Sequence, residues 1–286
     1  MARSVKDPSP DTSDPEAATA DPAFADMRYR DLFWPSRPYE DRCDRMGLRA
    51  LLPPTGDSLV ELGAGFGRLA NEYTGYRRVV LLDLSGVQIE AARERLKDDP
   101  RYEIVEGDMF ALPFEDASLD TVVCIRVIHH FEDPRPAIAE MARILRPGGV
   151  LVLEAANKRN FRAILLYVLR RQKTSPFKRG SEPATSAYLV PERFRQKAAG
   201  SPAGQPKAEW SATTDYHHSP VDVRHWLKAW GLEVKTTRTV SNFRARALTG
   251  RVPLRVLVGL ERATQRLLAP VTPGPEMFFK AIKKRG

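Results

Sequence analysis

The chain has 286 residues, and its 42% hydrophobic and 28% charged residues are ordinary values for a soluble globular protein. This length suits one large domain with additions better than two equal domains. No apolar run is long enough to span a bilayer and no secretory signal pattern is present, so we expect a cytoplasmic protein.

The net charge of +9 is spread unevenly along the chain. Residues 1–26 carry six acidic and two basic residues, whereas residues 221–286 carry fourteen basic and four acidic ones. A basic surface is compatible with an anionic partner, although solvated basic faces are common. The two cysteines, Cys43 and Cys124, lie far apart, which predicts two reduced thiols and indicates neither a disulfide framework nor a metal site.

The first 26 residues differ in composition from the remainder of the chain. They are rich in Asp, Pro, Ala, Ser and Thr and have almost no large apolar side chains, which predicts a disordered tail before a domain at residues 27–286. Aromatic residues first gather between Tyr29 and Tyr39, ahead of a helical pattern that Pro53 and Pro54 end. These aromatics either cover a ligand cleft or pack on a sheet.

Short apolar runs and helical patterns then alternate. Such alternation predicts an α/β fold with a mostly parallel, doubly wound sheet that is covered on both faces. We expect strands at residues 58–62, 78–83, 102–105, 121–125, 150–153, 232–240 and 276–282. We expect helices at about 68–73, 85–96, 133–145, 219–231 and 254–268.

The alternation lapses between residues 157 and 218, a proline-rich stretch that predicts an insertion in the domain. Its first part, residues 158–179, has eight basic and no acidic residues around apolar positions such as Ile164 and Leu165. This segment could be a lid helix over a small-molecule pocket, a helix on an anionic membrane surface or a contact for RNA. The lid is the preferred interpretation.

The residues that indicate a ligand begin at Val60-Glu61-Leu62-Gly63-Ala64-Gly65-Phe66-Gly67-Arg68. Glycines between an apolar strand and a helix allow a ligand to approach the backbone closely. Asp83 follows Gly63 by twenty residues, at the end of the next strand, where a carboxylate can accept hydrogen bonds from two ribose hydroxyls. Asp108 follows the third strand and could accept from an exocyclic amine, with Met109 against the base.

Two classes of adenosine cofactor fit this arrangement. A dinucleotide calls for a glycine at the sixth motif position, which here is Arg68. A sulfonium cofactor has no phosphate to bind, and Glu61 adds negative charge beside the turn. The sequence therefore favours S-adenosylmethionine over NAD.

These motifs resemble those of class I S-adenosylmethionine-dependent methyltransferases, nearest to the broad subgroup that includes the ubiquinone and menaquinone methyltransferases. The resemblance implies a seven-stranded, Rossmann-like sheet with an antiparallel last strand, and S-adenosyl-L-methionine as cofactor. It further implies the following cofactor-binding residues: Glu61, Gly63, Gly65, Asp83, Leu84, Asp108, Met109, Ile125 and Arg126. Of these, Ile125 and Arg126 would border the methyl group.

We therefore expect a methyltransferase that acts on a small-molecule or lipid- or quinone-like acceptor, with peripheral membrane contact compatible with its basic segment. His129 and His130 follow the fourth expected strand and either act as a catalytic base or only pack and cap the next loop. The group Tyr216 to His218 either reaches the acceptor or forms a polar loop. The alternatives are an RNA-modifying methyltransferase and a cofactor-binding module without turnover. The absence of an Asn-Pro-Pro-Tyr signature at Asn157 weakens the first.

Overall fold

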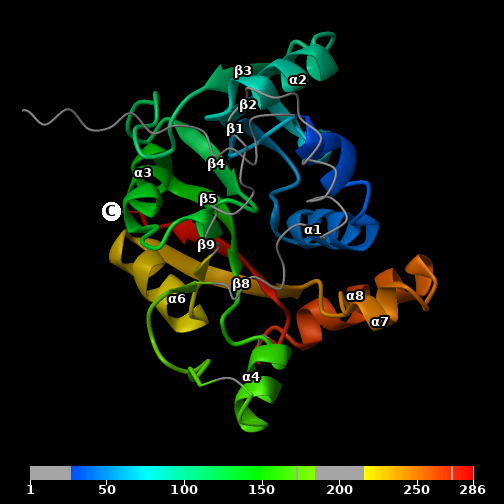
Figure 1. Cartoon of the computed structure of the whole chain (residues 1–286). Coiled ribbons are helices and arrows are strands. Elements are labelled where there is room, and N and C mark those ends of the chain that lie inside the picture. The colour runs from blue at the N-terminus through cyan, green and yellow to red at the C-terminus, as the bar shows by residue number, and fades with distance from the viewer. Residues whose placement is uncertain (1–26, 172, 184–215, 272, 286) are drawn as a thin grey trace, which may run out of the picture.

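The computed structural model describes residues 27–171, 173–183, 216–271 and 273–285, and a seven-stranded sheet forms its centre (Figure 1). The strand order is β3-β2-β1-β4-β5-β9-β8. The first five strands pair in parallel, and β9 is antiparallel to both β5 and β8. The predicted doubly wound sheet with an antiparallel last strand is confirmed. The strands are β1 Gly56–Leu62, β2 Tyr76–Asp83, β3 Tyr102–Glu106, β4 Leu119–Cys124, β5 Leu145–Ala156, β8 Leu232–Val240 and β9 Glu276–Lys283.

Helices cover both faces of this sheet (Figure 1). Alternate residues of a buried strand point to opposite faces, so Val60 packs in the core under α3 and α6, whereas Leu59 packs in the core under α1. The helices are α1 Pro38–Leu51, α2 Gly86–Leu96, α3 Arg135–Ile144, α4 Phe161–Val168, α6 Pro220–Ala229, α7 Arg246–Thr249 and α8 Leu254–Leu267. Shorter elements are the π-helix η2 Tyr29–Phe33, the 3₁₀ turns η3 Ala70–Glu72 and η4 Ile128–His130, and the small antiparallel pair β6 Glu182–Pro183 and β7 Tyr216–His217.

The structure differs from two of the expected elements. The helix expected at residues 68–73 is only the 3₁₀ turn η3, because the first residues between β1 and β2 form the glycine bend and those that remain are too few for a full helix. The strand expected to start at Val150 begins at Leu145, where the chain leaves α3. Leu145 pairs with Leu119, and the register then shifts before Val150 pairs with Thr121. Pro147, Gly148 and Gly149, which follow the helix expected at residues 133–145, are thus an irregular part of β5.

The predicted tail at residues 1–26 lies outside the described residues, as does the larger part of the expected insertion at 157–218. Within that insertion the structure describes α4, which projects below the sheet in Figure 1, and the pair β6 and β7. Among the described residues, every helix is too short or too polar to cross a membrane. Both cysteines are buried and free.

Candidate cofactor and acceptor site

The glycine bend after β1 combines tight packing with an open approach to the backbone. Gly63 has φ +69°, and a Cβ placed there would lie 2.2 Å from a methyl carbon of Val127. Gly65 has φ +54°, and the nearest atoms to its Cβ position are Tyr29 Cε1 at 3.9 Å and Gln88 Oε1 at 4.0 Å. Gly63 is therefore required for packing, whereas Gly65 leaves room beside the backbone, as a cradle for a ligand requires.

Asp83 faces this bend from the end of β2. Its Oδ2 accepts the Gly65 N–H at 2.7 Å, and its Oδ1 accepts the Ser85 N–H at 2.9 Å. Burial raises the pKa of Asp83, while these backbone hydrogen bonds oppose the increase. Because each carboxylate oxygen can accept a second hydrogen bond, the side chain can also hold ligand hydroxyls. Leu84 follows on the same loop and is half-buried.

The loop after β3 lies next to Asp83, because Glu106 pairs with Asp83 at the sheet edge. Asp108 is half-buried, and its Oδ1 accepts the Phe110 N–H at 2.9 Å, which fixes the start of this loop. The Met109 side chain is buried in the core on the α3 side. The structure therefore brings Asp83 and Asp108 to neighbouring strand ends, as predicted, while the contact of Met109 with an adenine stays a prediction.

The ends of β4 and β5 hold a buried network of ions. Arg126, with φ +64°, pairs with Asp44 of α1 at 2.9 Å and with Glu276 of β9 at 2.8 Å. Its backbone N–H is accepted by Glu154 at 2.8 Å. Burial raises the pKa of Glu154 to about 8. The Arg126 guanidinium thus joins α1 to the sheet, a role that sequence reasoning missed because its partners lie far along the chain.

Two other predicted cofactor residues have buried side chains. Ile125 packs in the core under α1. Glu61 lies on the same face of the sheet, and burial raises its pKa to about 7, although the nearby Arg68 opposes this increase. Glu61 therefore carries a full negative charge only above neutral pH. The charge that we expected beside the turn is weaker than the sequence implied.

Aromatic side chains of the N-terminal segment cover the bend. The Tyr29 ring lies 5.1 Å from Phe33 and 6.3 Å from Phe66, the residue between Gly65 and Gly67. The Arg68 guanidinium lies 3.5 Å from the ring centroid of Trp34 and also pairs with Asp41 and Asp44. Of the two interpretations of these aromatics, the structure favours a cover over the bend. Arg68 is already engaged, so it does not serve as a phosphate ligand, and the residues present suit an adenosyl sulfonium.

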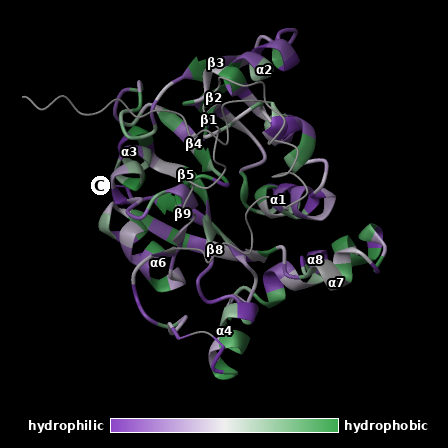
Figure 2. Ribbon diagram, in the orientation of Figure 1, coloured by the Kyte–Doolittle hydropathy of each residue, from purple (hydrophilic) through white to green (hydrophobic). Residues whose placement is uncertain are grey.

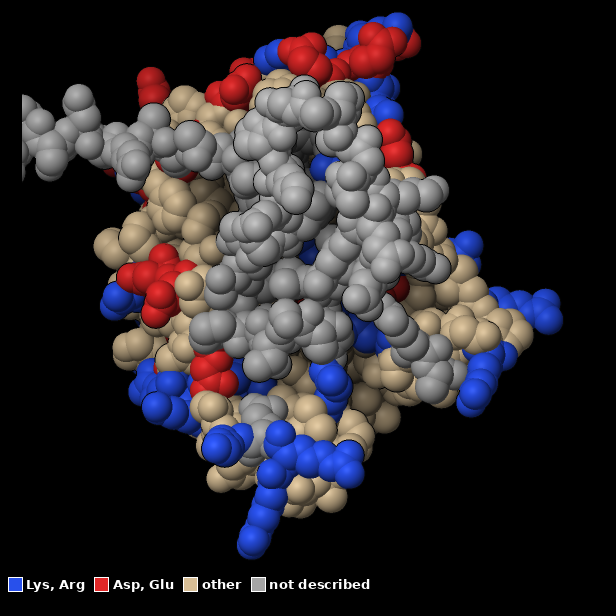
Figure 3. Space-filling model, viewed as in Figure 1, with Lys and Arg blue, Asp and Glu red and all other residues tan. Residues whose placement is uncertain are grey.

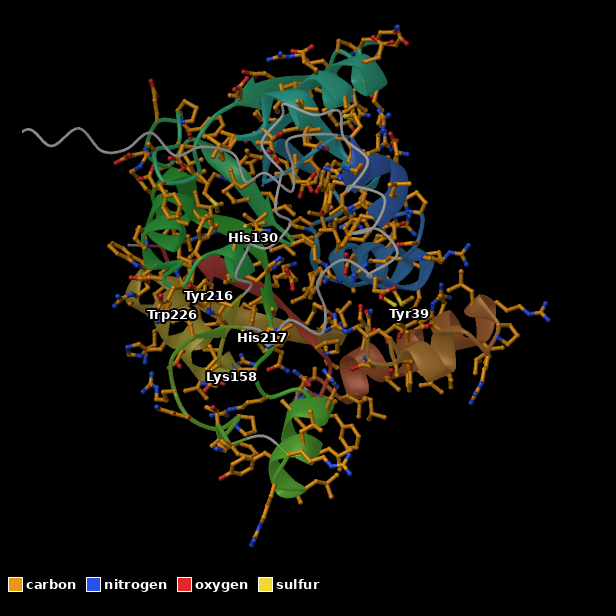
Figure 4. The ribbon with its side chains drawn as sticks, in the orientation of Figure 1. Tyr39, His130, Lys158, Tyr216, His217 and Trp226 are labelled. Atoms are coloured by element: carbon orange, nitrogen blue, oxygen red, sulfur yellow. The ribbon has the colours of Figure 1, made fainter. Side chains whose placement is uncertain are left out.

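Four histidines gather beyond the end of β4. The rings of His129 and His130 lie 4.3 Å apart on η4, and His130 is labelled in Figure 4 with Tyr216 and His217 of β7. Burial lowers the pKa of His129 well below 6.5, and charge on His130, Arg126, His218 and His217 lowers it further. His129 is therefore neutral at physiological pH and can accept a proton.

His218 anchors this region rather than forming a polar loop. Its Nε2 lies 3.1 Å from the Ile128 carbonyl oxygen and its Nδ1 lies 3.0 Å from Ser181 Oγ. Its backbone bridges to Asn157 just after β5. The segments that flank residues 184–215 are thereby fixed beside η4. The group Tyr216 to His218 therefore lies with His129 at the carboxyl ends of β4 and β5.

Residues 60–153 match a family model described as Methyltransferase domain. A demethylmenaquinone methyltransferase of Clavibacter sepedonicus is 35% identical over 106 residues, which cover 37% of this chain and 43% of the relative. The 27-O-demethylrifamycin SV methyltransferase of Amycolatopsis mediterranei is 35% identical over 112 residues, which cover 37% of this chain and 41% of the relative. The chain thus spans less than half the length of these two relatives.

A solved structure shows the same fold over nearly the whole chain. It belongs to a complex from Haloferax volcanii that contains a methyltransferase activator. The two chains align with a TM-score of 0.58 and 18% identity, covering 94% of this chain and 99% of that one. This likeness shows the fold. The family match places a methyltransferase domain at residues 60–153, similar in sequence to the menaquinone type, and its glycine bend facing Asp83 is that of a class I S-adenosylmethionine-dependent methyltransferase, which has S-adenosylmethionine as its cofactor.

Proposed function

We propose that this protein transfers a methyl group from S-adenosylmethionine to a small-molecule or lipid- or quinone-like acceptor. The observation that carries the proposal is the meeting of Asp83 with the backbone of Gly65 at 2.7 Å, because a ribose acceptor and an open backbone cradle are then at one place. Support for the acceptor class comes from the relatives, which are described as demethylmenaquinone and demethylrifamycin methyltransferases.

The cofactor would be held by residues on three neighbouring strand ends. We assign Gly63, Gly65 and Glu61 to its methionine part, Asp83 with Leu84 to its ribose and Asp108 with Met109 to its adenine. Ile125 and Arg126 would border the methyl group. The buried pairs of Arg126 with Asp44 and Glu276 support a positioning role, since they hold the end of β4 rigidly against α1 and β9. When bound, the cofactor supplies an electrophilic methyl group on a positively charged sulfur.

The chain has to orient the acceptor and exclude water more than it has to move protons, because the sulfide leaves uncharged. An acceptor hydroxyl or acidic carbon does lose a proton, and we propose His129 as the base that takes it, with His130 beside it. The lowered pKa of His129 keeps the imidazole unprotonated, as a base requires, but it also makes this imidazole a weaker base.

Calorimetry with S-adenosylmethionine tests the cofactor assignment. Asp83→Ala removes the ribose acceptor and should weaken binding by about 1–3 kcal/mol, or roughly 5- to 150-fold. Asp99→Asn, which changes a partly exposed acid before β3 that pairs with Arg101, is the matched control and should leave the affinity unchanged. Equal affinities for Asp83→Ala and the wild type would refute the site. Unfolding curves of each variant separate lost binding from lost structure.

Turnover needs its own experiment. Labelled S-adenosylmethionine is offered with demethylated quinols, phenolic small molecules and purified RNA. Methylation of the small molecules supports the proposal. Methylation of RNA alone, with binding that weakens steeply as salt rises, would establish the RNA-modifying alternative instead. Cofactor binding without methylation of any acceptor would identify a binding module.

A further inference from the structure

Helix α8 buries both polar and apolar residues on its inner side and leaves further apolar residues exposed on its outer side. Glu261 and Gln265 are buried against α1, where Glu261 accepts the Tyr39 hydroxyl at 2.7 Å (Tyr39 is labelled in Figure 4). On the other side of the helix, the exposed fractions of Val256, Leu260 and Leu267 are 45, 47 and 74%. The apolar side of a helix normally packs on the core. Helix α8 does pack Leu257 on the core, with Leu254 and Val258 beside it, so its exposed apolar residues form a second apolar stripe.

Helix α4 is apolar and exposed as well. None of its eight residues is buried, and Phe161 and Val168 are 65 and 67% exposed. Hydropathy colouring shows the apolar character of α4 at the lower end of the molecule (Figure 2). Asn160 caps the helix, since its side chain accepts the Ala163 N–H at 2.9 Å. A helix this short gains little stability in water by itself, and α4 does not pack as a closed lid.

The two helices contribute to one continuous surface. The Phe161 N–H donates to the Pro273 carbonyl oxygen at 2.7 Å, so α4 starts beside the segment that follows α8. Leu267 and Val271, at that end of α8, are both more than two-thirds exposed. We name this region the α4–α8 surface. Its exposed apolar residues are Phe161, Leu165, Val168, Leu169, Val256, Leu260, Leu267 and Val271.

Cations accompany these apolar side chains. Residues 158–179 contain no acid, and the only acid within α8 is the buried Glu261. Figure 3 shows Lys and Arg around α4 and along the outer side of α8, with few Asp or Glu beside them in this view. The exposed cations of the α4–α8 surface are Arg170, Arg171, Lys173, Lys178, Arg255, Arg262 and Arg266.

We propose that the α4–α8 surface docks the protein on an anionic lipid membrane. Exposed aliphatic side chains on one surface can insert at the boundary between headgroups and acyl chains, and the cations beside them can pair with lipid phosphates. A second copy of the chain fits less well, because two identical surfaces would bring their cations together. RNA also fits less well, because most of the exposed apolar residues named above are Leu and Val, on which bases do not stack, and Phe161 alone among them carries a ring.

The surface also adjoins the acceptor side of the site. Lys158, between β5 and α4, donates its backbone N–H to His218, and both residues lie where β5 ends. In Figure 4, His130, His217 and Lys158 follow one another from the centre toward α4. Docking through α4 would thus turn the acceptor side toward the membrane. This last step rests on the proposed function, whereas the docking itself does not.

Vesicle co-sedimentation of the full chain tests the proposal. Vesicles of phosphatidylcholine with phosphatidylglycerol should bind the protein, and pure phosphatidylcholine vesicles should bind it much more weakly. Leu165→Asp with Val168→Asp should weaken binding to the anionic vesicles at least tenfold. Arg170→Glu with Arg171→Glu should weaken it by about fivefold or more for each cation. All four positions are exposed, so circular dichroism should show an unchanged fold.

Two control variants introduce an acid in place of an exposed apolar residue or an exposed cation elsewhere on the surface. Trp230→Asp places an acid on an exposed aromatic at the opposite end of β8, and Arg77→Glu reverses an exposed charge on β2. Both should bind vesicles like the wild type. The proposal is overturned if the controls lose as much affinity as the α4 variants, if no anionic vesicle binds, or if the α4 substitutions instead abolish self-association or RNA binding. Neither cofactor nor acceptor is present, so the result is independent of methyl transfer.

Discussion

Glu154 should make the stability of this protein decrease as pH rises. Its side chain is fully buried on β5, and burial raises its pKa from 4.5 to about 8. Glu276 and Asp44 raise this pKa further, whereas the Arg126 guanidinium opposes them. In the folded protein the carboxyl is therefore protonated at neutral pH, while in the unfolded chain it is ionised.

The sign of the effect follows from this difference. The contribution of Glu154 to stability is complete below pH 4.5 and is lost progressively as pH rises to about 8. The gap between the two pKa values corresponds to roughly 4–5 kcal/mol in total, of which about 3.5 kcal/mol is lost between pH 5 and pH 8. This is a large part of the 5–15 kcal/mol, roughly, that stabilises an ordinary domain.

Urea unfolding of the wild type and Glu154→Gln at pH 5 and pH 8 measures this loss. The glutamine cannot ionise and keeps an oxygen for the Arg126 N–H, so its stability should fall less over this range, by about 3 kcal/mol. Glu103→Gln, which changes an exposed acid of β3, should behave like the wild type. If the wild type and Glu154→Gln lose equal stability between the two pH values, Glu154 is not neutral in the folded state and the reasoning fails.

Three further predictions follow from the site and the core. Gly63→Ala should lower the free energy of unfolding by about 2–5 kcal/mol in urea titrations, because its Cβ meets Val127, whereas Gly65→Ala should cost about 1–2 kcal/mol but weaken cofactor binding in calorimetry. His129→Ala should reduce kcat by about 10²–10⁴ without changing cofactor affinity, and wild-type activity should not fall between pH 8 and pH 6.5; a loss centred near pH 6.5 would contradict the lowered pKa. Neither buried cysteine should react with a thiol reagent before urea is added, and rapid reaction of the native protein would show that the core opens.

Local sequence was enough to predict much of the fold. The seven central strands were predicted within a few residues except β5, because each strand is an apolar run bounded by turn residues. The helix expected at residues 68–73 was wrong, because the apolar pattern there reflects the burial of Leu69 and Tyr73 and not a helix. The connection between the parallel strands β1 and β2 is short, and this length limits the segment to a 3₁₀ turn.

The cofactor side of the site was also visible in the sequence, in part. Gly65 and Asp83 lie on consecutive strand ends, and parallel pairing of β1 with β2 brings them together. Tyr29 belongs to the aromatic group that the sequence offered as a possible cover of a ligand cleft, whereas Gln88, which flanks the same bend, carries no local signal that would have identified it. Their positions depend on how η2 and α2 pack against the bend, which no short pattern records.

What the sequence determined by itself are the features that depend on neighbours along the chain: the strands, the glycine bend and the acids at strand ends. Only the tertiary structure decided the ion network and the placing of the basic, apolar segment 158–179 beside α8 on one surface. Arg126 and Glu276 meet across 150 residues. Glu261 and Gln265 can be buried on the inner side of α8 because they bond to α1 and to the loop after β8. The partners of a helix determine which of its polar residues can be buried, and partners that lie far along the chain do not appear in the local hydrophobic pattern.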